Sequence, residues 1–304
     1  MSGVITTSHF GKALWPGINA WYGKAYEDYP VEYTDLFDTF QSSKAFEEDV
    51  MVSSFGLAPV KEEGAAIQYD SEQQGFISRY SHVTYALGFI ITREMFDDDQ
   101  YDIVGQRRAQ ALARSMRQTK ETVAANVYNR AFNSSYTGGD GKELCATDHP
   151  NVAGGTWANE LTTAADLSEA SLEQAIIDMM AWTDDRGLLI AAMPEKLIIP
   201  PELVFEAERI LESPLRVGTA DNDANALKNL GKFRGGVTVN HYLTDADAWF
   251  IRTNVSNGMK HFERKADSFA EDNDFDTDNA KFKASARYSF GWSDPRGIFG
   301  SPGA

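Results

Sequence analysis

The chain has 304 residues, of which 42% are hydrophobic and 12% aromatic, so it encodes a globular protein rather than a disordered one. Asp and Glu number 45 against 28 Lys and Arg, and the formal net charge of −17 excludes a protein that coats nucleic acid by neutralising phosphates. The single cysteine, Cys145, excludes an internal disulfide framework. No stretch resembles a signal peptide and no run of about 18 apolar residues occurs, so we expect no membrane partner.

Residues 1–50 carry many large aromatic side chains without a helical or strand period. These are Phe10, Trp15, Trp21, Tyr22, Tyr26, Tyr29, Tyr33, Phe37, Phe40 and Phe46. We expect an extended N-terminal arm with one short helix over Asn19–Tyr26. Such an arm cannot build a core alone, so its rings pack either on their own domain or on another subunit, and the pattern leaves both open.

The next stretch predicts a long β-hairpin, because apolar and polar residues alternate on both sides of a polar connection. Its strand segments are 50–55 and 57–60 outgoing, and 76–80 and 82–92 returning. The connection over 61–75 is too long for a tight turn, and its acidic residues are Glu62, Glu63, Asp70 and Glu72. A two-stranded hairpin is marginal in water, so a long one needs a surface to lie on, which another subunit would supply.

The stretch Asp97–Phe132 predicts one long amphipathic helix. Three aspartates open it, and apolar residues recur at spacings of three, four or multiples of these, as at Leu112, Met116 and Val123. At 1.5 Å per residue it would be roughly 50 Å long. Its basic residues follow the acidic start and are Arg107, Arg108, Arg114, Arg117, Lys120 and Arg130. Either this is a long core helix or it is a spine to which several elements attach.

The second half of the chain predicts an α/β unit followed by strands. A polar, glycine-rich crossing over 133–160 is expected to hold little more than a short strand pair. The expected elements after it are helices over Ser168–Thr183 and Glu202–Leu211, and strands over Lys196–Ile199, Val237–Leu243, Trp249–Val255, Met259–Phe262 and Lys281–Gly291. We predict loops over 213–225 and 292–301, and no strand over the acidic stretch Ala266–Asn279. Together these elements assign the chain to the α+β class.

No catalytic motif is evident. Cys145 and His149 are four residues apart and could form a nucleophilic pair, but no third group that would orient the imidazole is apparent. The acidic run Asp272–Asp278 resembles a calcium loop, yet Thr277 and Lys283 occupy the positions that need Gly and Glu. The sequence Asp184–Arg186 is most simply the end of a helix. We therefore expect no catalytic residue, no metal and no cofactor.

Several short stretches resemble the Mu-like phage major head subunit family, whose members have the HK97-type capsid fold. They are Leu144-Cys-Ala-Thr-Asp-His-Pro150, Asp185-Arg-Gly-Leu-Leu-Ile190, Leu197-Ile-Ile-Pro-Pro-Glu-Leu203 and Trp292-Ser-Asp-Pro-Arg-Gly-Ile-Phe-Gly300. The resemblance implies five parts: an N-arm over 1–50, an E-loop with flanking strands over 51–95, a peripheral domain with a spine helix over 96–150, an axial α/β domain over 151–254, and return strands with the C-terminal tail over 255–304.

The same resemblance implies a major capsid protein. Hexamers and pentamers of it would form an icosahedral shell around double-stranded DNA, assembled in the host cytoplasm and found in the virion. A separate scaffolding protein and a portal are the implied partners, whether a decoration protein also binds is left open, and packaged DNA would be held without specific binding. Two alternatives stay open: another virion structural protein such as a tail component, and a soluble enzyme whose site is not recognised.

The charge pattern suggests one contact between subunits. The connection over 61–75 is acidic, whereas the long helix beyond its first turn is basic. We expect Glu62, Glu63, Asp70 and Glu72 of one copy to meet Arg107, Arg114 or Arg117 of a neighbour. Exposed ion pairs contribute only about 0–1 kcal/mol each, so these would set the register while the aromatic arm supplies the buried area.

Overall fold

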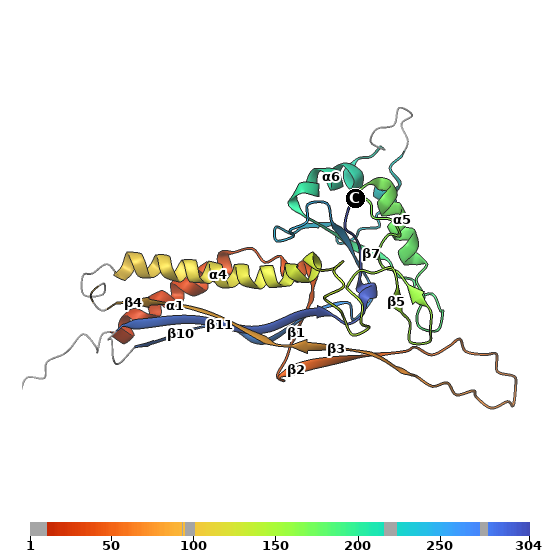
Figure 1. Ribbon diagram of the computed structural model, residues 1–304, viewed down its shortest axis with the longest axis horizontal. Coiled ribbons are helices and arrows are strands. Elements are labelled where there is room, and N and C mark those ends of the chain that lie inside the picture. Colours follow the sequence, from red (N-terminus) through yellow and green to blue (C-terminus); the bar gives the residue numbers. More distant parts are fainter. Residues whose placement is uncertain (1–10, 93, 95–100, 216–223, 274–278) are drawn as a thin grey trace, which may run out of the picture.

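A long helix lying on a four-stranded sheet forms the extended body of the molecule, which we call the long unit (Figure 1). The computed structural model describes residues 11–92, 94, 101–215, 224–273 and 279–304. A second sheet with its own helices, the compact unit, rises from one end of the long unit, and a hairpin projects below it (Figure 1). The predicted α+β class is therefore confirmed.

The predicted long helix is confirmed as α4, Tyr101–Asn129. It ends three residues before the predicted Phe132, and its predicted first residues, 97–100, lie outside the described part of the chain. Ala109 and Ala113 are fully buried against α1 and the sheet. Because alanine side chains are small, α4 can lie close to both.

The long sheet has the strand order β1-β10-β11-β4. Its strands are β1, Asp38–Gln41; β4, Val83–Ile91; β10, Met259–Asn273; and β11, Ala280–Trp292. β1 runs parallel to β10, and the other neighbours are antiparallel. Along β11, Phe282, Ala284, Ala286 and Tyr288 are buried beneath the helices, so the alternation predicted over Lys281–Gly291 is confirmed.

Two predictions about this sheet are wrong. The stretch 82–92 does not return along the hairpin, because β4 pairs with β11, with Val83 opposite Tyr288. Strand β10 continues through Ala266–Asn273, where the acidic composition predicted no strand. The reason is that β11 supplies a partner for this stretch and buries its apolar side chains, as where Phe269 lies opposite Ala284. The calcium-like run beyond Asn273 falls on residues 274–278, which lie outside the described residues.

The projecting hairpin consists of β2, Phe46–Val52, paired with β3, Gln74–Ser81. Residues 53–73, which we call the hairpin loop, form no strand, so the predicted segment 57–60 is wrong. The loop extends far from the rest of the chain (Figure 1). A strand needs a neighbour for its backbone groups, and although the N–H of Ser53 donates to Gln73 at the base of the loop, the two described arms form no strand ladder beyond it.

The N-terminal segment is not extended over its described part. It forms α1, Gly11–Asp28, which is longer than the predicted helix over 19–26 and packs on α4. The short helix α2, Tyr33–Leu36, follows. Phe10 and the side chain of Trp15 lie outside the described residues. Tyr22, Tyr33 and Phe37 are buried in the long unit and its junction, so of the two alternatives the rings from Tyr22 to Phe37 pack on their own chain.

The compact unit is a four-stranded sheet of order β12-β9-β7-β8 covered by helices. Its strands are β7, Pro194–Ile199; β8, Val237–Val239; β9, Trp249–Thr253; and β12, Ile298–Ser301. Its helices are α5, Glu169–Met180; α6, Val204–Glu212; and α7, Ala226–Leu230, with 3-10 turns at Pro201–Leu203 and Pro295–Gly297. Ser168 caps α5, because its side chain accepts from the N–H of Ser171. β12 lies in the tail that was predicted to be only turns, and it forms because β9 pairs with it.

The two units share a core at the end of α4. Leu197 and Ile199 point toward the helices of the compact unit, whereas Ile198 between them packs with Tyr128 of α4 and Phe250. β7 is thus buried on both faces, which suits its run of Leu197, Ile198 and Ile199. A short strand pair, β5 at His149–Pro150 and β6 at Thr156–Trp157, lies in the predicted glycine-rich crossing.

Candidate assembly surfaces

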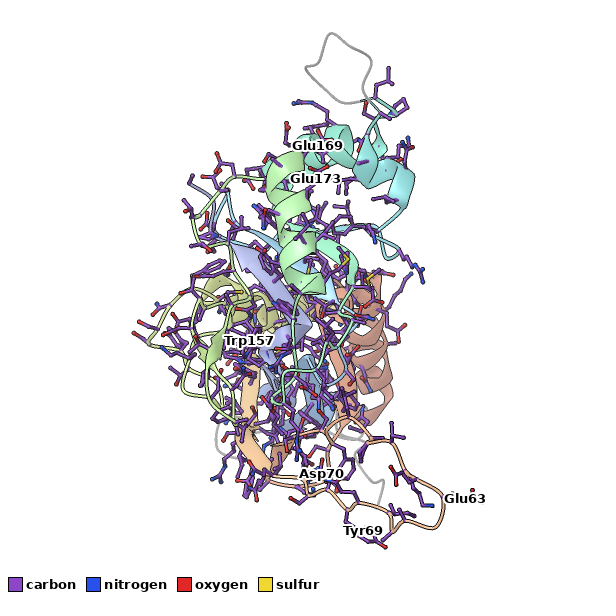
Figure 2. The ribbon with its side chains drawn as sticks, turned by 90° about the vertical axis from the view of Figure 1, so that its right-hand side faces the viewer. Glu63, Tyr69, Asp70, Trp157, Glu169 and Glu173 are labelled. Atoms are coloured by element: carbon purple, nitrogen blue, oxygen red, sulfur yellow. The ribbon has the colours of Figure 1, made fainter. Side chains whose placement is uncertain are left out.

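The three most exposed large hydrophobic side chains of the described chain lie on the hairpin loop. Val60 is 95% exposed, Tyr69 90% and Leu57 81%. In Figure 2, Tyr69 and Glu63 lie on the part of the loop that extends away from the body of the protein. Exposed apolar side chains gathered on one surface are typical of interaction sites. The described part of this chain leaves these three uncovered.

The base of the hairpin loop is attached to the compact unit by Arg186. Its Nη1 donates to both carboxylate oxygens of Asp70, at 3.1 and 2.9 Å, and its Nη2 donates to the backbone oxygen of Ser71. The backbone N–H of Gly56, on the opposite arm of the loop, donates to Asp70 at 2.9 Å. The N–H groups of Gly56 and Ser71, and then Arg186, lower the pKa of Asp70 below its usual range. Arg186 therefore holds the returning arm of the loop, and Asp70 joins that arm to the outgoing one.

Asp184 orients that arginine. Its Oδ1 accepts from the N–H groups of Arg186, at 2.9 Å, and Leu188, at 2.8 Å, and this fixes the turn that carries Arg186. The Ser54 hydroxyl of the hairpin loop also donates to Asp184. Burial alone would raise the pKa of Asp184, but these hydrogen bonds lower it below its usual range. The stretch predicted to be only a helix end is thus the attachment point of the loop.

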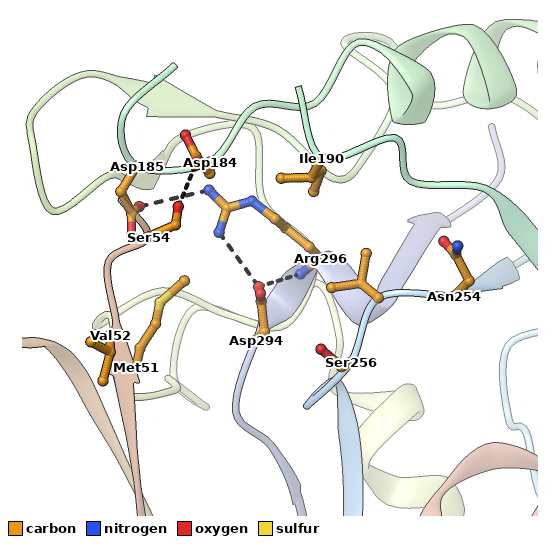
Figure 3. A pocket seen from close by; sticks show the side chains of 11 residues that line it. Met51, Val52, Ser54, Asp184, Asp185, Ile190, Asn254, Ser256, Asp294 and Arg296 are labelled. Carbon is orange, nitrogen blue, oxygen red and sulfur yellow. Dashed lines mark hydrogen bonds and ion pairs between the residues drawn. The ribbon is translucent and has the colours of Figure 1, made fainter. Parts of the chain in front are cut away.

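Behind this attachment lies a cavity of about 430 Å³ that contains a buried arginine between two aspartates (Figure 3). Arg296 is 3% exposed, and its guanidinium lies 3.8 Å from Asp185 and 3.6 Å from Asp294. It also donates to Asn151 at 3.0 Å and stacks 4.3 Å above the ring of Trp157. Burial raises the pKa of Asp294, while Arg296 opposes that rise. Arg296 therefore joins the segment after β11, the glycine-rich crossing over 133–160 and the turn after α5.

The N-terminal segment is attached by a buried carboxylate on α4. Glu121 is 1% exposed and accepts from the backbone N–H groups of Tyr33, at 2.9 Å, and Glu32, at 3.2 Å. Burial raises the pKa of Glu121 to about 7, against the effect of these two hydrogen bonds. Glu32 in turn accepts from the ring and backbone of His241, at 2.7 and 2.9 Å, which links the segment to the compact unit.

The predicted site residues fall into two groups. Glu62, Glu63, Asp70 and Glu72 are exposed on the hairpin loop, and Arg107 and Arg114 are exposed on α4. Arg117 differs, because it is 8% exposed, donates to the backbone oxygen of Tyr26 at 3.0 Å and stacks 4.0 Å over its ring. α1 therefore covers Arg117, which sequence reasoning placed on the surface. The hairpin loop and the N-terminal half of α4 lie at opposite ends of the molecule, so only a second copy could bring them together (Figure 1).

The loop that carries Cys145 and His149 is held in place by hydrogen bonds between buried side chains. His149 is fully buried, with Nδ1 2.6 Å from Asp140 and Nε2 3.0 Å from Asn159, so neither ring nitrogen is left for the thiol. Burial raises the pKa of Cys145 well above its ordinary value. A thiol that stays protonated is a poor nucleophile, so the geometry does not support a catalytic pair.

Within the described ranges, no group of three or more His, Cys, Asp and Glu side chains is placed to hold a metal ion. Among the helices that the structure describes, none has the length and apolar character needed to cross a membrane.

Sequence reasoning missed the residues that hold the loop and the units together. Arg186 and Arg296 act on partners far away in the sequence, 116 positions for Asp70 and 145 for Asn151. The one available signal was their position in Asp185-Arg-Gly and Pro295-Arg-Gly, where an arginine precedes a glycine in a turn next to an apolar segment. That signal indicates a turn and does not identify a partner.

Comparison with known proteins places this geometry in context. A family model described as "Phage capsid protein" matches residues 77–300. The capsid of an empty GTA particle is similar in structure, with 14% identity, 98% of each chain covered and a TM-score of 0.54. So are a virus-like particle from Pyrococcus furiosus (11% identity, 94% of this chain and 98% of that chain, TM-score 0.51) and the procapsid of bacteriophage JBD30 (14%, 98% and 76%, TM-score 0.51). At these identities the structures show a shared fold, the one predicted. No curated protein sequence matches the chain.

Proposed function

The chain belongs to the phage capsid protein family, and from that premise we propose that it is the major head subunit, which assembles as hexamers and pentamers into an icosahedral shell around double-stranded DNA. The observation that carries the proposal is the hairpin loop. Its apolar side chains, Leu57, Val60 and Tyr69, have no cover within the described chain, and the loop is held in a fixed direction by Arg186. A second copy is the partner that a shell supplies.

The supporting charge pattern concerns the acidic loop and the basic helix. We propose that Glu62, Glu63 and Glu72 of one copy lie near Arg107 and Arg114 of a neighbour. Asp70 already pairs with Arg186 of its own chain, and Arg117 is covered by α1, so these two contribute through their own chain instead. Because the pairs would be exposed, they favour one register rather than supplying most of the affinity.

The remaining partners are expectations from the family resemblance. We propose a separate scaffolding protein and a portal as partners and assembly in the host cytoplasm, and the sequence leaves open whether a decoration protein binds. Membership of the narrower Mu-like family is part of the same proposal. No catalytic role is proposed.

The proposal is tested by expressing the chain with and without its scaffolding protein and examining the product by sedimentation and negative-stain microscopy. We expect rings or closed shells. A variant with Leu57→Ser, Val60→Ser and Tyr69→Ser should melt at the wild-type temperature yet fail to form them. The matched control is Phe205→Ser, which removes an exposed apolar side chain from α6 and should assemble normally.

Two outcomes would contradict the proposal. One is a wild-type chain that stays a monomer under every condition tried, and the other is a serine variant that assembles as well as the wild type. Open tubes instead of shells would support a tail component.

A further inference from the structure

Two segments of the compact unit each carry charge of one sign, whereas α6 between them is mixed, with Glu206, Glu208 and Glu212 beside Arg209. Residues 158–185 contain seven acidic residues and no Lys or Arg, whereas residues 224–244 contain three basic residues and no Asp or Glu. Both segments lie on the compact unit (Figure 1). Two surfaces of opposite charge on one molecule attract each other when they belong to different copies, whereas two surfaces of the same charge repel.

The acidic side is the outer face of α5. Ile177 at its centre is 56% exposed, and Met180 is 38% exposed. Glu173, four residues before Ile177, is its neighbour on the helix surface, and Asp178 lies about 100° further round the helix, while Leu172, Ile176 and Met179 fill the core on the opposite side. We call Glu173, Ile177, Asp178 and Met180 the α5 face. α5 itself contains no basic residue.

The basic side lies at β8, the edge strand of the compact sheet. Leu230 is 65% exposed and Val237 39%, with Lys232 and Arg234 between them. Within the described residues, no ion pair joins Lys232 or Arg234 to an acidic side chain. We call these four residues the β8 edge. Glu195 lies next to it, and the edge still has a net positive charge.

The two surfaces lie at opposite edges of the same sheet. The N–H of Gly235 donates to Glu195 at 2.7 Å, on the outer side of β7, which fixes the β8 edge there. The segment around α5 is tied to the other edge strand, β12, where Ser301 donates to Ala165 at 2.8 Å and Trp182 packs on Phe299. α5 and α6 accordingly appear on opposite sides of the compact unit in Figure 1. One copy therefore cannot bring the two surfaces together.

We infer that the α5 face of one copy binds the β8 edge of the next, head to tail, around a ring of compact units. Each surface has two exposed apolar residues beside two charges, and the charges are of opposite sign. A contact between two different surfaces of identical copies repeats in one direction, and it closes into a ring when the rotation between copies allows. This inference rests on the proposed function, since it names the contact by which capsomers would form.

A second copy is the occupant that fits the observations. An unrelated acidic partner could bind the β8 edge but would leave Ile177 and Met180 uncovered. A basic partner could bind the α5 face but would leave Leu230 and Val237 uncovered. The same chain supplies both complementary surfaces in equal number. Like charges facing each other across an interface are strongly unfavourable, so the pattern also excludes pairing of two α5 faces.

The test is a charge exchange in the full-length chain. The first variant carries Glu173→Lys with Asp178→Lys, the second carries Lys232→Glu with Arg234→Glu, and the third carries all four changes. We expect the assembled fraction to fall about tenfold in each of the first two, because like charges then meet, and to recover in the third. Thermal unfolding of each variant shows whether it is folded. The matched control, Glu202→Lys with Glu208→Lys, adds the same charge on the 3-10 turn Pro201–Leu203 and on α6, and it should assemble normally.

A mixture of the first two variants gives a second measurement. In the mixture, the basic α5 face of the first variant meets the acidic β8 edge of the second, and the two unchanged surfaces meet at the next contact. Alternating copies therefore fit around a ring with an even number of members, and the mixture should recover rings that neither variant forms alone. If the first or second variant assembles like the wild type, or if neither the third variant nor the mixture recovers, the inference is wrong. A wild-type chain that never assembles would instead contradict the proposed function, so the two failures are distinguishable.

Discussion

Arg186 and Asp70 form an ion pair across 116 positions of the sequence, with Nη1 donating to both carboxylate oxygens at 3.1 and 2.9 Å. Together with the Ser54–Asp184 hydrogen bond, the pair joins the compact unit to a loop whose Glu63 and Tyr69 lie away from the body of the protein (Figure 2). Its importance therefore lies in the direction of the loop rather than in the stability of the fold. An exposed ion pair contributes only about 0–1 kcal/mol, which is sufficient to bias the orientation of a loop with few other contacts.

Replacing Arg186 should free the hairpin loop. Lys61 is the only trypsin site within residues 53–73, so the rate of cleavage there reports the motion of the loop. In Arg186→Ala we expect cleavage at Lys61 to be about threefold faster or more, with the melting temperature nearly unchanged. The control is Arg209→Ala, which removes an exposed arginine paired with Glu206 on α6. Equal cleavage rates in the two variants would show that Arg186 does not restrain the loop.

Replacing Arg296 should destabilise the whole fold. Arg296→Met keeps the volume but leaves Asp185 and Asp294 buried without their cation. Removing one partner of a buried ion pair typically costs about 3–5 kcal/mol, and we expect a loss of that order in the free energy of unfolding measured in urea. Arg209→Met, on the surface, should cost less than about 1 kcal/mol. A similarly small loss in Arg296→Met would mean that the buried pair is already hydrated.

Glu121 should make stability fall as the pH rises. Burial raises its pKa from 4.5 to about 7 in the folded chain, so the folded state binds a proton that the unfolded state releases above pH 4.5. Between these two pKa values the free energy of unfolding decreases with increasing pH, by on the order of 3 kcal/mol for this group. Glu121→Gln removes the titration.

The difference between Glu121→Gln and the wild type should therefore shift in favour of the variant from pH 5 to pH 8. Urea unfolding of both proteins at the two pH values measures it. Glu208→Gln, an exposed residue on α6, is the control and should follow the wild type. A constant difference for Glu121→Gln would show that its carboxyl has an ordinary pKa in the folded chain.

The Cys145 thiol should be unreactive in the native protein. It is 1% exposed, and burial raises its pKa. Alkylation by iodoacetamide at pH 8 should be at least about a hundredfold slower than in urea-unfolded chain, because the thiolate is the reacting species. Rapid alkylation of the folded protein would reopen the interpretation of this loop as a catalytic site.

Purified subunits should not retain linear DNA at about 0.15 M salt, because binding to phosphates requires a basic surface and this chain has a net charge of −17. Filter binding at several salt concentrations measures this. Retention that weakens steeply with salt would reveal a basic surface strong enough to overcome the net charge.

Much of the fold could be predicted from periodicity alone. α4, α5, β7 and β11 have apolar residues at helical or strand spacing, and each was found close to its predicted position. These elements are specified locally, because one buried face fixes the period of the side chains that fill it. The strand character of β10 beyond Ala266 and of β12 was not predictable, since it depends on the neighbour rather than on the segment's own composition.

The sequence by itself determined that this is an acidic, cysteine-poor α+β chain with one long helix and a hairpin that lacks a partner. Only the tertiary structure decided that α1 covers Arg117, that β4 leaves the hairpin to pair with β11, and that Arg186 and Arg296 join segments far apart in the chain. Periodicity records which residues avoid water, a property of each segment. The pairing of strands and of charges depends on which segments meet, and that is settled only when the whole chain packs.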